Sequence, residues 1–276
     1  MGCAAIYAIS YTLCPSVSSS CACIGPRTTL VSFPLASNVT GQPFAAGKII
    51  SRAHKYGAAV LCDAAQYVAG HSPDVSSSGA DMLAFSGHKI GSLPVGALYC
   101  SSGLMAELGM YNTGGGTVSD VHVRGGRVSP EYFGDYRRFE AGIQNYPGII
   151  SLGAAIDFIN AVGRKESWNR VTGLAALCRK ELEKIPEVLP VGPPDCGSAI
   201  VSFLFRDRNI CAQDFNIFLN SGLPRSVICV RCGNHCAVPV HRLNGVSETV
   251  RVSFFVYNTE EDVSCFVSAL KKFLRR

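Results

Sequence analysis

Long apolar runs and a strong excess of one charge are both missing from this sequence. No apolar run reaches the roughly 18 residues that a membrane-spanning helix needs, so we expect no membrane segment. Only 16% of the residues are charged, and the net charge of +5 is not gathered into a long basic run. That distribution argues against nucleic-acid binding. No positive charge precedes an apolar stretch near residue 1, as a secretory signal requires, so we expect a soluble intracellular protein.

Cysteine is abundant, with 13 residues in a chain of 276. The number is odd and the spacing is not that of a small disulfide scaffold, so free thiols in a reducing compartment are expected. Cys229, Cys232, His235 and Cys236 are possible zinc ligands. Zinc ligands usually come as two separated pairs, however, and adjacent His–Cys ligands are awkward. We therefore expect no metal, and we expect Cys229 and Cys232 to be small strand hydrophobes.

The order of elements predicts an α/β layer followed by a smaller α+β unit. Apolar stretches typical of strands lie at 30–33, 58–62, 82–85 and 95–100, with helical patterns at 44–55 and 148–163. This alternation favours a buried, mostly parallel sheet. The later pattern has helices at 168–184 and after a capping arrangement at 258–261, and strands at 199–205 and 249–256. We therefore predict an unassigned segment 1–26, an incomplete large domain 27–163 and a small α+β domain 164–276.

Two residues with chemical potential follow neighbouring strands. Asp63 comes directly after strand 58–62, and Lys89 follows strand 82–85. The carboxyl ends of parallel strands share one edge of a sheet, and ligands bind in the crevice there. A lysine able to form a Schiff base, with an acid placed against a pyridine nitrogen, is what chemistry with pyridoxal 5'-phosphate (PLP) requires. Either residue alone would be read as a turn former or a surface charge.

Six ordered motifs carry a resemblance to a known family. They are SerAsnValThrGly (37–41), AspAlaAlaGln (63–66), SerGlyHisLys (86–89), GlyGlyGly (114–116), ArgPheGluAlaGly (138–142) and ArgCysGlyAsnHisCysAla (231–237). In order and spacing they resemble the class V aminotransferase family of fold-type-I PLP enzymes, in its cysteine desulfurase and selenocysteine lyase branch. The resemblance covers roughly residues 27–276. It implies removal of sulfur or selenium from L-cysteine or L-selenocysteine, leaving L-alanine.

The resemblance also implies a cofactor site. Lys89 would form the Schiff base with PLP and later move the alpha proton. Asp63 would pair with the pyridine nitrogen, and Gln66 would donate to the phenolate oxygen of the ring. Ser86 and His88 would hold the phosphate.

A substrate site is implied in the same way. Asn38 and Arg251 would bind the substrate carboxylate, for which a planar guanidinium is well suited. Cys236 would be the nucleophile that takes the sulfur as a persulfide, with Arg231 nearby. A homodimer and a sulfur-acceptor protein are the partners that the resemblance implies.

The sequence departs from the family pattern at three places. The family has a longer segment before the Asn38 motif, which supplies a Gly/Thr phosphate turn and a ring-stacking residue, and residues 1–24 provide neither. We therefore expect the cleft to be open on that side, with apolar sheet surface exposed and weaker PLP binding. Ile143 stands where the family has a Thr, and Asn234 where it usually has a second His. Another class V aminotransferase or lyase, with Cys236 incidental, and a non-catalytic relic remain as alternatives.

Overall fold

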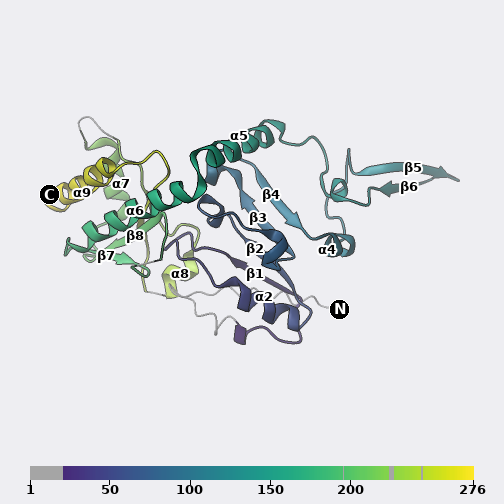
Figure 1. Ribbon diagram of the computed structural model, residues 1–276, viewed down its shortest axis with the longest axis horizontal. Helices are drawn as coiled ribbons and strands as arrows, with labels where there is room; N and C mark the ends of the chain where they lie inside the picture. Colours follow the sequence, from purple (N-terminus) through teal and green to yellow (C-terminus); the bar gives the residue numbers. More distant parts are fainter. Residues whose placement is uncertain (1–20, 195, 224–226, 244) are drawn as a thin grey trace.

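The computed structural model describes residues 21–194, 196–223, 227–243 and 245–276 (Figure 1). Most of the segment 1–26 that the sequence left unassigned, residues 1–20, lies outside the described residues. The described chain forms two hydrophobic cores, one built from residues between Ile24 and Ile159 and the other from residues between Val171 and Leu270. Each core lies against its own four-stranded sheet.

The first sheet has the strand order β1-β2-β3-β4. Its strands are β1 (Leu30–Pro34), β2 (Ala59–Asp63), β3 (Met82–Ser86) and β4 (Gly96–Cys100). β1 pairs with β2 and β2 with β3 in parallel, whereas β4 is antiparallel to β3. A parallel return needs a long crossover, and only residues 87–95 separate β3 from β4. The predicted α/β layer is therefore confirmed, but its sheet is mixed.

Helices and short turns connect the parallel strands. α2 (Ala46–Lys55) carries the chain from β1 to β2 and buries Ile49, Ile50 and Ala53 against the sheet. The 3-10 turn η1 (Tyr67–Ala69) and the short helix α3 (Val75–Ser78) lie between β2 and β3. After β3 the chain enters the 3-10 turn η2 (Gly87–Ile90). The segments that follow the carboxyl ends of β2 and β3 are thus short and start directly at the sheet edge.

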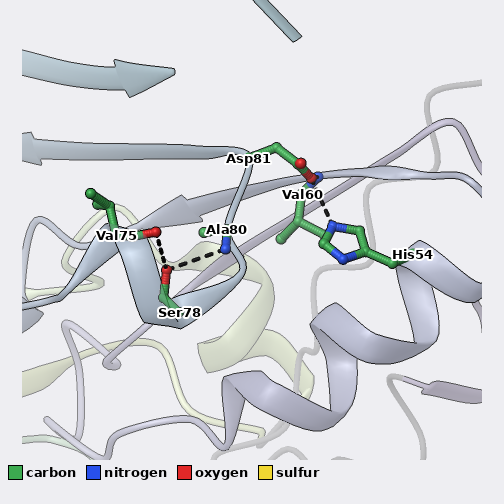
Figure 2. Close-up of polar contacts among 6 residues, drawn as sticks. All are labelled: His54, Val60, Val75, Ser78, Ala80 and Asp81. Atoms are coloured by element: carbon green, nitrogen blue, oxygen red, sulfur yellow. Dashed lines mark hydrogen bonds and ion pairs between the residues drawn. The ribbon is translucent and has the colours of Figure 1, made fainter. Parts of the chain in front are cut away.

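The partly buried carboxylate of Asp81 links the starts of β2 and β3 to the end of α2 (Figure 2). Asp81 Oδ2 accepts a hydrogen bond from the backbone N–H of Val60 at 2.8 Å and contacts His54 Nε2 at 2.9 Å. Next to it, Ser78 Oγ accepts from the backbone N–H of Ala80 at 3.2 Å. Because Asp81 directly precedes β3, it links β2 and the end of α2 to β3. These contacts help to fix the register of β2 and β3, in which the carboxyl ends of the two strands lie at the same edge of the sheet.

A β-hairpin extends away from the body of the molecule (Figure 1). It comprises β5 (Val118–Arg124) and β6 (Arg127–Tyr132), whose side chains are almost all exposed. The two residues between the strands, Gly125 and Gly126, have φ of 55° and 78°, as a two-residue hairpin turn requires. This hairpin was not predicted from the sequence, although the GlyGly pair was a usable signal. The helix α4 (Ser102–Glu107) and the 3-10 turn η3 (Tyr136–Phe139) lie at its base.

Two helices lead from the first unit to the second. α5 (Tyr146–Val162) and α6 (Arg164–Glu183) are bent by 83° at Gly163, whose φ is 91°. α6 begins four residues before the predicted start at 168. Among the described residues no single helix has the length and hydrophobicity to cross a membrane, and α5 and α6 satisfy that test only when counted together despite their bend.

The second sheet is antiparallel throughout, in the order β7-β8-β10-β9. Its strands are β7 (Val188–Val191), β8 (Ile200–Phe205), β9 (Arg231–Gly233) and β10 (Thr249–Ser253). The accompanying helices are α7 (Ala212–Ser221), α8 (Val238–Leu243) and α9 (Glu260–Leu274). α9 starts at a capping box formed by Thr259 and Asp262, which confirms the predicted helix start. β10 is shorter than predicted, ending at Ser253 and not at 256.

The loop after β1 joins the two units. The buried Ser202 hydroxyl on β8 donates to the carbonyl of Val39. Gly41, at φ 74°, approaches Ser198 so closely that a Cβ there would lie 1.6 Å from the Ser198 Oγ. Gly41 therefore combines a left-handed backbone with a contact that admits no side chain. This docking brings Asn38 against the second unit.

Candidate active site

The carboxyl ends of β2 and β3 bring three polar residues together. Asp63 is the last residue of β2 and pairs with Ala84 of β3, and its Oδ1 accepts from the backbone N–H of Ala65 at 2.8 Å. Gln66 follows in the turn before η1, and Lys89 lies in η2. Lys89 Nζ donates to Gln66 Oε1 at 3.3 Å. The parallel pairing thus places Asp63, Gln66 and Lys89 at one edge of the sheet.

The environment of Lys89 favours its uncharged amine. Burial lowers the pKa of Lys89 most strongly, and the positive charges of Arg251 and Arg231 lower it further, while Asp63 acts in the opposite direction. A desolvated lysine beside other cations is a lysine prepared to act as a nucleophile. The electrostatic coupling also shows that both arginines of the second unit lie near Lys89.

Arg251 and Arg231 lie directly opposite each other on adjacent strands. Arg251 on β10 pairs in register with Arg231 on β9. Burial, and then the charge of Arg231, lower the pKa of the Arg251 guanidinium. Like charges directly opposite each other destabilise a sheet, so an anion between them would relieve a repulsion that the fold maintains. Arg251 Nη1 donates to the Asn38 carbonyl at 2.8 Å, and its buried Nε has no hydrogen-bond partner among the described residues.

A tight turn after β9 presents Cys236. His235 and Cys236 have φ of 52° and 59°, a left-handed conformation that is uncommon for residues other than glycine. The backbone N–H of Cys236 donates to Asn234 Oδ1 at 3.2 Å, and Asn38 Nδ2 donates to the His235 carbonyl at 2.7 Å. The Cys236 side chain is exposed whereas the His235 side chain is buried. The side-chain amide of Asn38 therefore supports the turn that carries the cysteine.

Ser86 is the last residue of β3, and His88 directly precedes Lys89 in η2. They line a hollow of about 520 Å³ together with the start of β4 and residues from the segment that leads into α5. Asn145 also lines this hollow and donates through Nδ2 to the Pro94 carbonyl at 2.9 Å. Asp63 and Lys89 are not among the lining residues. Ile143, which stands where a Thr was expected, is 92% exposed.

The possible zinc ligands are not arranged around a common point. Within the described part of the chain, no three His, Cys, Asp or Glu side chains are grouped so that they could hold a metal ion. Cys232 packs against the second core, and burial raises the pKa of its thiol to about 12, as expected for a small hydrophobe. For Cys229 that expectation was wrong, because this residue is exposed and precedes β9.

A chain of polar contacts lies behind Cys236 and was not predicted from the sequence. His235 Nε2 lies 2.9 Å from Thr249 Oγ1, and His241 Nε2 lies 3.2 Å from the same oxygen. All three residues are buried. A usable signal was the pair of histidines six positions apart, His235 before α8 and His241 within it. A single sequence, however, does not reveal that both turn towards Thr249 on β10.

The chain is similar to cysteine desulfurases in sequence. The sequence model of the family described as aminotransferase class-V matches residues 13–266. A protein named "Cysteine desulfurase" from Escherichia coli O6:H1 is 34% identical over 251 residues, which are 90% of this chain and 59% of that protein. A "Probable cysteine desulfurase 1" from Mycobacterium leprae is 34% identical over 250 residues, which are 90% of this chain and 39% of that protein. The chain thus spans only part of the length of these relatives.

Solved structures show the same likeness. The cysteine desulfurase CsdA from Escherichia coli superposes with a TM-score of 0.86 at 29% identity, over 96% of this chain and 63% of that one. The apo cysteine desulfurase from Thermococcus onnurineus NA1 gives a TM-score of 0.79 at 30% identity, over 90% of this chain and 60% of that one. The α/β fold therefore matches cysteine desulfurase structures over part of their length.

Proposed function

The chain belongs to the aminotransferase class-V family, in its cysteine desulfurase branch, and we propose that it removes sulfur from L-cysteine, or selenium from L-selenocysteine, with PLP as cofactor. The observation that carries the proposal is that Lys89 and Asp63, at one edge of the first sheet, lie within electrostatic reach of Arg231 and Arg251 from the second sheet. A lysine kept towards its uncharged form next to two arginines suits a substrate that combines an amino group with a carboxylate.

The residues present fit the proposed cofactor. Lys89 offers an amine whose pKa is lowered mainly by burial, and Asp63 offers an exposed carboxylate at the same edge. Gln66 already holds the Lys89 amine at 3.3 Å and can turn to donate to the cofactor ring. Ser86 and His88 would supply hydroxyl and imidazole donors for the phosphate. The fold would then be that of a fold-type-I PLP-dependent transferase, divided into domains 27–163 and 164–276.

When bound, PLP supplies an electron-accepting ring that stabilises negative charge at the substrate alpha carbon. Asp63 would keep the ring nitrogen protonated, and Lys89 would carry the proton at the alpha carbon. Arg251, with the carbonyl of Asn38 fixing Nη1, would pair with the substrate carboxylate.

Cys236 would then receive the sulfur. Its thiolate attacks the substrate sulfur, an S–S bond forms as the C–S bond breaks, and the alanine carbon gains a proton. The sum is L-cysteine plus the Cys236 thiol giving L-alanine plus a Cys236 persulfide. An exposed position on a turn held by Asn38 and Asn234 suits this role, because the persulfide must next be handed to an acceptor, which we propose to be another protein.

A pair of cysteine variants tests the assignment. Cys236→Ala should abolish sulfide release from L-cysteine in the presence of PLP and a thiol reductant, while leaving the visible absorbance of bound PLP unchanged. Cys265→Ala is the matched control, because Cys265 is an exposed cysteine on α9, and it should retain wild-type turnover. Undiminished sulfide release by Cys236→Ala would reject the nucleophile and favour another class V reaction.

We also propose that the chain acts as a homodimer. α5 exposes several large apolar side chains, among them Ile150 at 73% and Phe158 at 54%. β4 exposes Leu98 at 61% on the neighbouring edge of the sheet. Exposed apolar side chains gathered on neighbouring elements are typical of a surface that a partner covers. Sedimentation equilibrium should give twice the mass of 29.4 kDa, and a monomer at all concentrations would reject this part of the proposal.

A further inference from the structure

His235 is anchored more firmly than its place in a surface turn requires. Its ring is buried, with the residue only 7% exposed, although the neighbouring Cys236 is exposed. Its carbonyl accepts from Asn38, its ring contacts Thr249, and its φ of 52° is left-handed. A left-handed backbone at a residue other than glycine costs free energy, so the surrounding contacts must hold it in place.

The contacts behind His235 determine which ring nitrogen carries its proton. His241 Nδ1 lies 3.0 Å from the Ala237 carbonyl, which can only accept, so Nδ1 carries the hydrogen. Neither of the two His241 ring contacts is a carboxylate, and burying an unpaired charge is costly, so we assign Nε2 as the acceptor from the Thr249 hydroxyl. Having donated its single hydrogen, Thr249 Oγ1 must accept from His235 Nε2. The neutral His235 ring is therefore left with an unprotonated Nδ1.

That Nδ1 lies buried without a partner among the described residues, and so does the Nε–H of Arg251. One is an acceptor and the other a donor. Thr249 and Arg251 are two residues apart on β10 and project from the same face of the strand, so the His235 ring that contacts Thr249 lies alongside Arg251. Arg251 is also the charged group with the largest influence on His235.

We propose that His235 is a positioning residue for Arg251: its Nδ1 accepts from Nε–H and fixes the plane of the guanidinium. Asn38 O then holds Nη1. The remaining guanidinium hydrogens are left for a carboxylate ligand. The pairing is inferred from these two unpartnered buried atoms of the free protein, and only the identity of the carboxylate as that of the amino-acid substrate rests on the proposed function.

The groups around His235 keep this acceptor unprotonated. Burial, Arg251 on β10, His241 on α8 and Arg231 on β9 together lower the pKa of His235 to about 4, against an opposing contribution from Thr249. No carboxylate is among these influences. Over the neutral range the ring therefore stays an acceptor. Protonation in acid would turn Nδ1 into a donor and break the contact with Arg251.

Nuclear magnetic resonance of the free protein tests the proposal without cofactor or substrate. With ¹⁵N-labelled histidine and arginine, His235 should show the Nε2–H tautomer, and Arg251 should show an Nε–H signal protected from exchange with water. Both features should be lost together as His235 is protonated in acid. An Nδ1–H tautomer at neutral pH, or an Arg251 signal that does not respond when His235 is protonated, would overturn the proposal.

Two variants of Thr249 separate positioning from folding. Thr249→Ser keeps the hydroxyl and should preserve the His235 tautomer and the protected Arg251 signal. Thr249→Val removes the hydroxyl at nearly constant volume, so His235 should become a mixture of tautomers and the Arg251 protection should be lost. An unchanged spectrum in Thr249→Val would overturn the proposal. If Thr249→Val does not fold, the acid titration of the wild-type protein decides the question. Because no turnover is measured, failure here is distinct from failure of the proposed enzyme activity.

Discussion

Acidification should destabilise this protein through His235. The pKa of His235 is lowered from 6.5 to about 4 in the folded chain, chiefly by burial. Between these two pH values the His235 ring is protonated in the unfolded state and neutral in the folded state. Stability contributed by the neutral ring is therefore fully present above pH 6.5 and is lost as the pH falls towards 4. A difference of about 2.5 pKa units corresponds to about 3 kcal/mol, with a slope that reaches at most about 1.4 kcal/mol per pH unit.

Urea unfolding between pH 7 and pH 4.5 measures this loss. His71 also has a pKa lowered by burial and contributes in the same direction, so the wild type alone does not isolate His235. His235→Gln removes one titrating ring, and its free energy of unfolding should fall less steeply with pH than that of the wild type. The two curves should converge in acid even if the variant is less stable at pH 7. Parallel curves would refute the assignment of a neutral, buried His235.

Two further substitutions probe the site and its scaffold. Arg231→Gln removes a like-charge cross-strand pair, so it should raise the free energy of unfolding in low salt by about 0.2–1 kcal/mol. Arg208→Gln makes the same change in net charge at an exposed residue and should leave the free energy of unfolding unchanged. Equal effects of the two substitutions would contradict a repulsion between Arg231 and Arg251. Gly41→Ala should destabilise the fold by about 1–3 kcal/mol in urea titrations, because the φ of Gly41 is 74° and Ser198 occupies the position of the added Cβ. Gly47→Ala, on the open face of α2, should be neutral or stabilising. An unchanged stability of Gly41→Ala would show that the loop after β1 docks differently.

Local patterns in the sequence were sufficient for much of the fold. The alternation of apolar strands and helices predicted β1, β2, β3 and α2, because each buries one side in a repeating pattern. The same reasoning placed Asp63 and Lys89 at one sheet edge, since parallel strands share their carboxyl ends. Strand direction is less local. β4 is apolar like its neighbours, and only the short connection from β3 indicates that it runs antiparallel.

Contacts between distant segments could not be predicted. Asn38 and His235 are far apart in the chain, and their hydrogen bond depends on how the two units dock. The binding of a substrate carboxylate by Asn38 stays a prediction, and nothing in the sequence indicated that in the free chain its amide donates to His235 and its carbonyl accepts from Arg251. Thr249 was seen only as a strand residue, because nothing in its neighbourhood indicates the two histidines that approach it.

We propose that Lys89 is the residue that binds PLP. Incubation with PLP, reduction with borohydride and peptide mapping should place the cofactor on the peptide that contains SerGlyHisLys, residues 86–89. The label should disappear in Lys89→Ala and persist in Lys55→Ala, in which an exposed lysine at the end of α2 is removed. A label on another lysine, or equal labelling of both variants, would contradict the account.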